Sequence, residues 1–281
     1  MFLTLVALTG IGVEQMRRFI FNVVGMWAVA LSTGFAQTTV PDETGLWQVW
    51  VSQTNAATDH AAVAQACAAF RSKAPTDALA VVAQGLEAWH LLKAGKTNEA
   101  VQLLGPMVAL SGDAMQKAGA EMARGWLTRL DREAVRAALK RAYQKDVEFP
   151  ATLERIKTLK KMSMPPFEDR WGQAWSYQTT ELATIKGTPR QRYVLESTRL
   201  GAESDLTGAL AVPYGSRITV APVRVMGGEG AGETVEFAAP GGKSGALTVG
   251  TGMEGVTFAF NGKSIIVLAD RDHWRVVARP R

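Results

Sequence analysis

The sequence predicts an α+β multidomain protein: helical hairpins, then a long amphipathic helix on a small antiparallel sheet, then a small all-β module. A change of hydrophobic period leads to this prediction. Apolar residues recur at helical spacing from about residue 42 to residue 143, whereas from about residue 208 they alternate with polar ones. With 281 residues and 47% hydrophobic content, the chain can build two or three modest domains rather than one core.

Residues 1–36 have the three regions of a secretory signal peptide. Two arginines precede an apolar run over residues 19–30, and small residues end at Ala36. The run is short and a polar residue interrupts it, so a signal cleaved after Ala36 is favoured over a permanent membrane span. Met16 is an alternative start of this segment. We therefore expect an exported protein of the periplasm or cell envelope, in contact with the membrane only if the signal is not cleaved.

Charge, cysteine and histidine content argue against several functions. The net charge of +5 is too small to indicate nucleic-acid binding. Cys67 is the only cysteine, so no internal disulfide can form. His60, His90 and His273 are far apart and lack the spacing of a metal site. We expect neither a nucleic-acid partner nor a cofactor held by these residues.

The first predicted domain, residues 37–130, is helical. Its hydrophobic pattern predicts helices at 43–52, 60–70, 76–93, 97–110 and 112–130. The segment from Leu86 through Gly95 to Leu104 resembles one unit of a tetratricopeptide-like hairpin. No second copy follows at the 34-residue period of such repeats. We therefore expect stacked helical hairpins that offer a surface for binding another protein.

The second predicted domain, residues 131–207, begins with an amphipathic helix over residues 131–143. One face is apolar, and the other carries a basic stripe of Arg129, Arg132, Arg136 and Lys140. Like charges at this spacing destabilise an isolated helix by roughly 0.2–0.5 kcal/mol per pair. Acidic neighbours are therefore expected, supplied by a protein partner or by the chain's own carboxylates. A plain solvated face is the alternative.

Two short motifs follow this helix. Phe149 and Pro150 end it, because proline suits only the first turn of a new helix, here expected at residues 150–161. The second motif, which predicts a tight turn leading into a strand, comprises Asp169, Trp171, Gly172, Trp175 and Tyr177. The aspartate can accept hydrogen bonds from turn amides, and the glycine can adopt a positive φ. We expect the three aromatic side chains to lie in a core, with a ligand-stacking platform as the alternative.

In this order the two motifs resemble the C-terminal domain of the major pseudopilin of the type II secretion system. The resemblance covers about a quarter of the chain and continues through the strand at 192–197 into the loop at 200–203. It implies a non-catalytic structural or interaction protein of secretion or pilus-like envelope assembly. It also implies that secretion-system components are its protein partners.

Two features of that family are altered in this chain. A pilin subunit has about twenty apolar residues ahead of its helix, whereas residues 115–126 are a soluble amphipathic sequence. Incorporation into a filament by the usual route is therefore not expected. The family's acidic calcium loop is reduced to two candidate ligands, Glu203 and Asp205, although calcium takes six to eight oxygen ligands.

The third predicted domain, residues 208–281, is a small β module. Alternation predicts strands at 218–220, 223–225, 234–237, 256–260, 264–268 and 274–277. Asn261 and Gly262 predict a type I′ hairpin turn. The dense polar cluster at 270–273 is interpreted as a charged turn between two strands. A pocket beside it would favour the alternative function, a periplasmic enzyme or ligand-binding protein with its site in this module.

Overall fold

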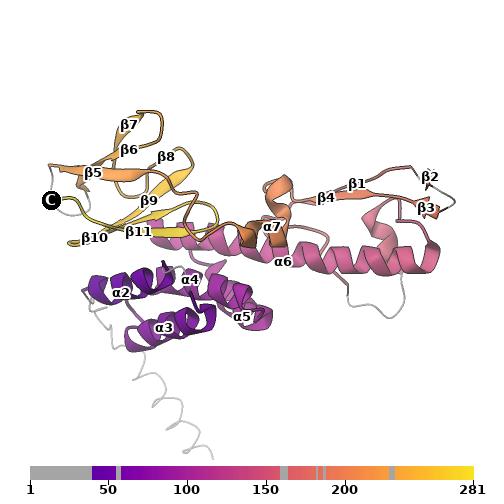
Figure 1. Ribbon diagram of the computed structural model, residues 1–281, viewed down its shortest axis with the longest axis horizontal. Helices are drawn as coiled ribbons and strands as arrows, with labels where there is room; N and C mark the ends of the chain where they lie inside the picture. Colours follow the sequence, from indigo (N-terminus) through magenta and orange to yellow (C-terminus); the bar gives the residue numbers. More distant parts are fainter. Residues whose placement is uncertain (1–39, 55–57, 159–163, 182, 186–187, 228–231) are drawn as a thin grey trace, which may run out of the picture. The chain divides into compact units, whose positions relative to one another are not determined.

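The computed structural model describes residues 40–54, 58–158, 164–181, 183–185, 188–227 and 232–281 (Figure 1). The predicted signal peptide, residues 1–36, lies outside the described residues. Residues 41–281 form one compact unit with the predicted α+β fold, in which helices accompany several small antiparallel sheets. In the described ranges, no helix combines the length and the hydropathy needed to cross a membrane.

The N-terminal helices follow the hydrophobic pattern of the sequence. They are α2 (Glu43–Gln53), α3 (His60–Lys73), α4 (Ala80–Lys93), α5 (Thr97–Met107) and α6 (Ala114–Asp146). Asp113 caps α6 by accepting a hydrogen bond from the Gln116 amide at 2.8 Å. The predicted domain boundary between residues 130 and 131 falls inside α6, so one continuous helix takes part in both of those domains.

The C-terminal half of α6 packs against a small antiparallel sheet (Figure 1). The elements of this region are η1 (Leu153–Thr158), β1 (Ser176–Thr179), β2 (Ala183–Ile185), β3 (Thr188–Arg190) and β4 (Tyr193–Glu196). β1 pairs with β4, and β2 pairs with β3. Leu139 of α6, Ile156 of η1, Trp175 and Leu195 of β4 share one buried cluster. The predicted packing of this helix on a sheet is confirmed. Of the helix expected at 150–161, residues 150–158 contain only the 3-10 turn η1, and residues 159–161 lie outside the described residues.

The C-terminal β module contains two sheets. η2 (Ala202–Ser204) and α7 (Leu206–Ala211) lead into it. Its strands are β5 (Ala221–Met226), β6 (Thr234–Ala238), β7 (Ser244–Leu247), β8 (Gly252–Met253), β9 (Val256–Asn261), β10 (Ile265–Ala269) and β11 (Trp274–Ala278). The sheets have the strand orders β5-β6-β7 and β11-β10-β9-β8. The strand predicted at 218–220 is wrong, because these residues are not part of a sheet, although Ile218 and Val220 are fully buried.

Strand β10 is buried on both faces. Ile265, Val267 and Ala269 belong to the core shared with the N-terminal helices. Ile266 and Leu268 belong to the core between the two β sheets. The helical region and the β module, which the sequence divides near residue 208, therefore share one hydrophobic core. The β11-β10-β9-β8 sheet lies between this core and the core of the two β sheets.

The loop between β9 and β10 differs from its prediction. A type I′ turn needs positive φ at both central residues, but neither Asn261 nor Gly262 has a positive φ. Instead, the Glu43 carboxylate accepts hydrogen bonds from the Lys263 and Ser264 amides at 2.8 and 2.6 Å. The type I′ prediction is wrong because a side chain from α2, far away in sequence, binds the loop amides.

Gly85 allows α4 to approach the fully buried Trp274 ring, and a Cβ at this position would lie 2.6 Å from Trp274 Nε1. We therefore expect Gly85→Ala to lower the free energy of unfolding by about 1–3 kcal/mol through overpacking. Gly105→Ala in α5 is the matched control, because no atom lies within 4 Å of its added Cβ. It should raise stability by up to about 1 kcal/mol, the helix-propensity difference. Urea denaturation measures both, and stabilisation by Gly85→Ala would contradict the close approach.

Candidate functional site

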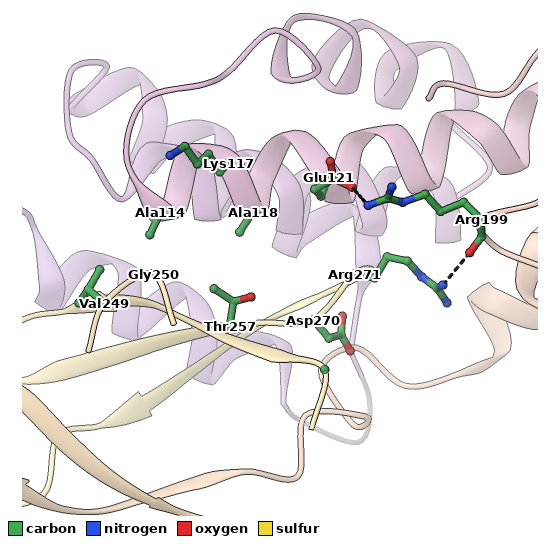
Figure 2. A pocket seen from close by; sticks show the side chains of 11 residues that line it. Ala114, Lys117, Ala118, Glu121, Arg199, Val249, Gly250, Thr257, Asp270 and Arg271 are labelled. Carbon is green, nitrogen blue, oxygen red and sulfur yellow. Dashed lines mark hydrogen bonds and ion pairs between the residues drawn. The ribbon is translucent and has the colours of Figure 1, made fainter. Parts of the chain in front are cut away.

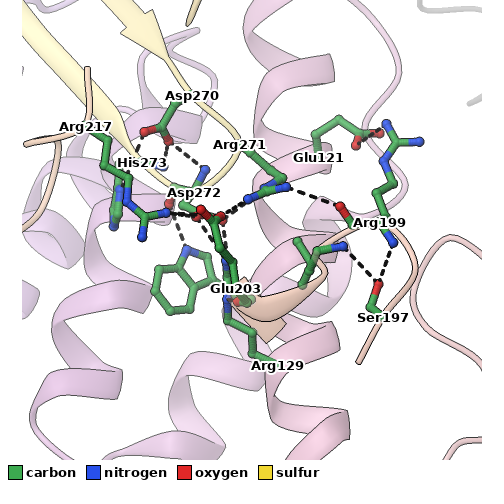
Figure 3. Close-up of polar contacts among 12 residues, drawn as sticks. Glu121, Arg129, Ser197, Arg199, Glu203, Arg217, Asp270, Arg271, Asp272 and His273 are labelled. Atoms are coloured by element: carbon green, nitrogen blue, oxygen red, sulfur yellow. Dashed lines mark hydrogen bonds and ion pairs between the residues drawn. The ribbon is translucent and has the colours of Figure 1, made fainter. Parts of the chain in front are cut away.

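A buried ion pair joins α6 to the turn between β10 and β11 (Figure 3). Arg129 Nη1 and Nη2 donate to Asp272 Oδ1 and Oδ2 at 2.8 and 3.0 Å. The two side chains are 0% and 3% exposed. Arg129 Nε also donates to the Glu203 carbonyl oxygen at 2.8 Å. The two parallel bonds between Arg129 and Asp272 form a bidentate ion pair, which is stronger than a single neutral hydrogen bond.

Further contacts tie the same turn to its neighbours. Trp126 Nε1 of α6 donates to the Asp272 carbonyl oxygen at 2.8 Å. Arg217 Nη1 lies 3.4 Å from Asp272 Oδ2 and 3.2 Å from Glu203 Oε2. Arg271 also forms an ion pair with Glu203. Three parts of the chain that are distant in sequence are therefore connected at this turn.

Asp270 closes the turn. Its Oδ1 accepts hydrogen bonds from the Asp272 and His273 amides at 2.7 and 2.6 Å, and its own amide donates to the His273 carbonyl oxygen at 3.0 Å. Burial raises the pKa of Asp270, but the His273 side chain and these amides together lower it below its usual value. The polar cluster at 270–273 is thus a charged turn between β10 and β11, as predicted.

The basic stripe obtains its acidic neighbours from the chain itself. Arg129 is fully buried against Asp272 and is therefore not available to a partner. Arg132 Nη1 lies 3.1 Å from Asp205 Oδ1. Arg136 pairs with Glu133 at 2.9 Å and lies 3.7 Å from Asp205. Of the stripe, Lys140 is exposed and its ammonium group has no partner among the described residues.

The predicted calcium ligands are held by basic side chains. Glu203 Oε2 pairs with Arg217 and Arg271. Asp205 accepts a hydrogen bond from the Gly208 amide, which lowers its pKa, and pairs with an arginine of the basic stripe. The described ranges contain no group of three or more His, Cys, Asp or Glu that could hold a metal. Glu203 and Asp205 do not fit a calcium site, because calcium would have to displace arginines from both carboxylates.

The predicted turn at residue 169 lies against α6. Asp169 Oδ1 accepts hydrogen bonds from the Trp171 and Gln173 amides at 2.9 and 3.0 Å. Gly172 has a φ of +77° and donates its amide hydrogen to the Asp169 carbonyl oxygen. Asp169 Oδ2 accepts from Ser197 Oγ at 2.7 Å. Asp169 thus fixes both the turn and the loop that follows β4.

The aromatic residues of this motif make internal contacts. Trp171 Nε1 donates to Glu121 Oε2 of α6 at 2.9 Å. Trp175 is buried in the core under the C-terminal half of α6. The Tyr177 hydroxyl donates to the Pro150 carbonyl oxygen at 2.8 Å, and burial raises its pKa to about 12. The two motifs are therefore in direct contact with each other.

A groove of about 450 Å³, the distal groove, lies on the C-terminal half of α6. Aromatic rings line it: the Tyr143 and Phe149 centroids are 4.5 Å apart, and those of Phe149 and Tyr193 are 4.7 Å apart. Lys140 and Arg136 line its edge. The distal groove thus combines an apolar floor with the outer part of the basic stripe.

A larger hollow, of about 650 Å³, lies between the N-terminal half of α6 and the β8-β9 region (Figure 2). Ala114 and Ala118 of α6 face Val249 and Gly250 at one end of the hollow. Four charged side chains lie at its other end: Glu121, Arg199, Asp270 and Arg271. Lys117 and Thr257 complete the polar lining. The hollow adjoins the 270–273 turn, where the sequence places the site of the alternative function.

The sequence predicts the turn but carries no signal for most residues that line the hollow. Lys117, Glu121, Arg199 and Thr257 belong to segments with no recognisable motif. The sequence near the hollow offers one local signal. Small residues such as Ala118 and Gly250 stand where α6 and the β module approach each other. Such a signal does not distinguish a hollow from ordinary close packing.

No family model, curated protein or solved structure matches this chain. The resemblance to the pseudopilin domain therefore stays a prediction based on the two motifs.

Proposed function

We propose that this chain is a non-catalytic interaction protein of an exported assembly related to type II secretion or to pilus-like structures. The observation that carries the proposal is the packing of the two motifs on α6. α6 ends at Asp146, just before Phe149 and Pro150. The turn at Asp169 returns the chain to the same helix, where Trp171 donates to Glu121, before β1 pairs with β4. This is the order of helix, turn and sheet that the family resemblance implies.

The distribution of charge supports a protein contact on this half of the molecule. Two cations, Arg136 and Lys140, and one anion, Glu133, line the distal groove. Arg136 pairs with Glu133, whereas the Lys140 ammonium group has no partner among the described residues. Aromatic side chains and arginine are enriched in protein interfaces. The expected partner surface is apolar with acidic residues at its edge.

Photo-cross-linking in the native host tests the proposal. A cross-linking amino acid at position 140 would lie at the edge of the distal groove, and Lys140 has no partner among the described residues whose loss would disturb the fold. Position 263 is the matched control, because Lys263 is exposed but lies in the β9-β10 loop. We expect mass spectrometry to identify a secretion or pilus-like component cross-linked to position 140 and not to position 263.

Two results would overturn the proposal. One is a set of partners at position 140 that contains no component of such an assembly. The other is cell fractionation that finds the mature chain in the cytoplasm, since the proposed role requires export.

A further inference from the structure

We propose that the hollow between α6 and the β8-β9 region binds a small molecule with an apolar body and one carboxylate group. Its volume of about 650 Å³ lies within the range of roughly 300–1,000 Å³ that is usual for small-molecule sites. The proposal goes beyond the interaction function. It concerns the opposite half of α6 from the distal groove, so either proposal can fail without the other.

The acceptor groups of the hollow already have partners. Glu121 Oε1 accepts from Arg124 Nη1 at 2.8 Å, and its Oε2 accepts from Trp171 Nε1 at 2.9 Å. Asp270 Oδ1 accepts from two amides of its own turn. Both carboxylates are therefore largely satisfied within the protein, and a ligand gains little by donating hydrogen bonds to them.

The donor groups, by contrast, are largely free. The Lys117 ammonium group and the Thr257 hydroxyl have no hydrogen-bond partner among the described residues. The guanidinium of Arg199 makes one long contact, from Nη2 to Glu121 Oε2 at 3.4 Å, and stacks at 5.2 Å on the Trp171 ring. Free donors and an excess of cations select a ligand group that accepts hydrogen bonds and is negatively charged.

A carboxylate fits this charged end of the hollow. Arg199 and Arg271 lie beside each other there, and Arg271 Nη1 donates to the Arg199 carbonyl oxygen at 3.3 Å (Figures 2 and 3). The guanidinium of Arg199 stacks on the Trp171 ring, its side chain is about half exposed, and its Nε and Nη1 have no partner among the described residues. A planar guanidinium can bind both oxygens of a carboxylate.

The other end of the hollow fits an apolar chain. Ala114 and Ala118 of α6 face Val249 and Gly250 across it (Figure 2). None of these side chains offers a polar atom, and the turn at Gly250 approaches α6 closely, since a Cβ there would lie 3.7 Å from Ala114 Cβ. The hollow is therefore polar at one end and apolar at the other, as a carboxylate with an aliphatic tail requires.

Three probes separate the parts of this inference. Hexanoate carries both the charge and the apolar chain, hexanol carries the chain alone, and inorganic phosphate carries charge alone. Binding to the ¹⁵N-labelled protein is followed by amide chemical shifts of residues 114–121 and 249–257. We expect saturable shifts with hexanoate. Hexanol and phosphate should each bind with an affinity at least about tenfold lower.

Substitutions test the location. Arg199→Gln should weaken hexanoate binding about tenfold, because a charged hydrogen-bonding group is lost. Ala118→Leu should fill the apolar end and abolish binding. Ala134→Leu is the matched control, since Ala134 is an exposed position of the same helix outside the hollow, and it should bind as the wild type does.

Each contrary result overturns the inference. Equal affinity for hexanoate and hexanol would refute the carboxylate contact, and equal affinity for hexanoate and phosphate would refute the apolar contact. Unchanged binding by Ala118→Leu, with wild-type spectra elsewhere, would place the ligand outside the hollow. None of these results affects cross-linking at position 140, so a failure here is distinct from a failure of the proposed function.

Discussion

Asp272→Ala is expected to lower the free energy of unfolding by about 3–5 kcal/mol. The substitution leaves the fully buried Arg129 guanidinium without its carboxylate. A buried charge that loses its partner keeps the full cost of its removal from water, and this cost exceeds the value of the lost hydrogen bonds. Urea denaturation measures the effect, and the unfolding midpoint should fall at an unchanged m value.

Exposure explains why this pair has a larger effect than the pair of Arg136 and Glu133. Arg136→Ala removes an arginine of the same helix whose partner, Glu133, is about one-third exposed. Its expected cost is about 1 kcal/mol or less. The double substitution Arg129→Met with Asp272→Leu should recover part of the loss, because it removes both buried charges. If Asp272→Ala and Arg136→Ala cost the same, the Arg129 pair is not buried in solution.

The position of Arg129 also shows where the sequence prediction reached its limit. Arg129 follows Met122 and Trp126 at helical spacing, which places it on the buried face of α6. It also precedes Arg132 at the spacing of the basic stripe, and charge favours the exposed face. Its partner Asp272 is 143 residues away. Because the pairing is tertiary, no local pattern could assign this arginine to the core.

The elements with a strong period were predictable for the opposite reason. β10 reads as a continuous apolar run because one face meets helices and the other meets a second sheet. The helix at 131–143 is predictable from its apolar face, but its continuity with residues 114–130 is not. The two halves of α6 face different cores. The sequence therefore contains two apolar faces on one helix, and this pattern predicts two helices.

The hollow could not be predicted, because it depends on how distant segments of the chain pack together. Its lining comes from α6, from the loop at Arg199, from the β8-β9 region and from the turn at 270–271. Only the turn was singled out, because its charges are consecutive in the sequence. The other polar lining residues are Lys117, Glu121, Arg199 and Thr257. Each is a single polar residue in a segment that shows no motif.

Mild acid is expected to destabilise the fold through two histidines that lie near each other. His90 is fully buried, and its Nδ1 lies 2.9 Å from Nδ1 of His60. Burial, together with the charges of His60 and Lys93, lowers the pKa of His90 to about 3. Burial and Lys93 also lower the pKa of His60. In such a pair one nitrogen donates and the other accepts, so full protonation would bring two N–H groups against each other.

The sign of the effect follows from the direction of these shifts. In the unfolded chain His90 returns to a pKa near 6.5, so between pH 6.5 and about 3 the unfolded state binds more protons than the folded state. Its contribution to stability is complete above pH 6.5 and is lost as the pH falls toward 3. Between pH 8 and pH 5 the expected loss from His90 alone is about 2 kcal/mol. Urea denaturation across this range measures it.

His90→Leu separates this cause from every other titration. The variant places an apolar side chain of similar size in the core, and this side chain cannot accept a proton. Its free energy of unfolding should therefore change less between pH 8 and pH 5 than that of the wild type. Leu91→Met, a substitution of similar volume at the next buried position of α4, should keep the wild-type pH dependence. A wild-type protein that is equally stable at both pH values would show that His90 is protonated without cost. In that case the pair with His60 must open to solvent in the folded state.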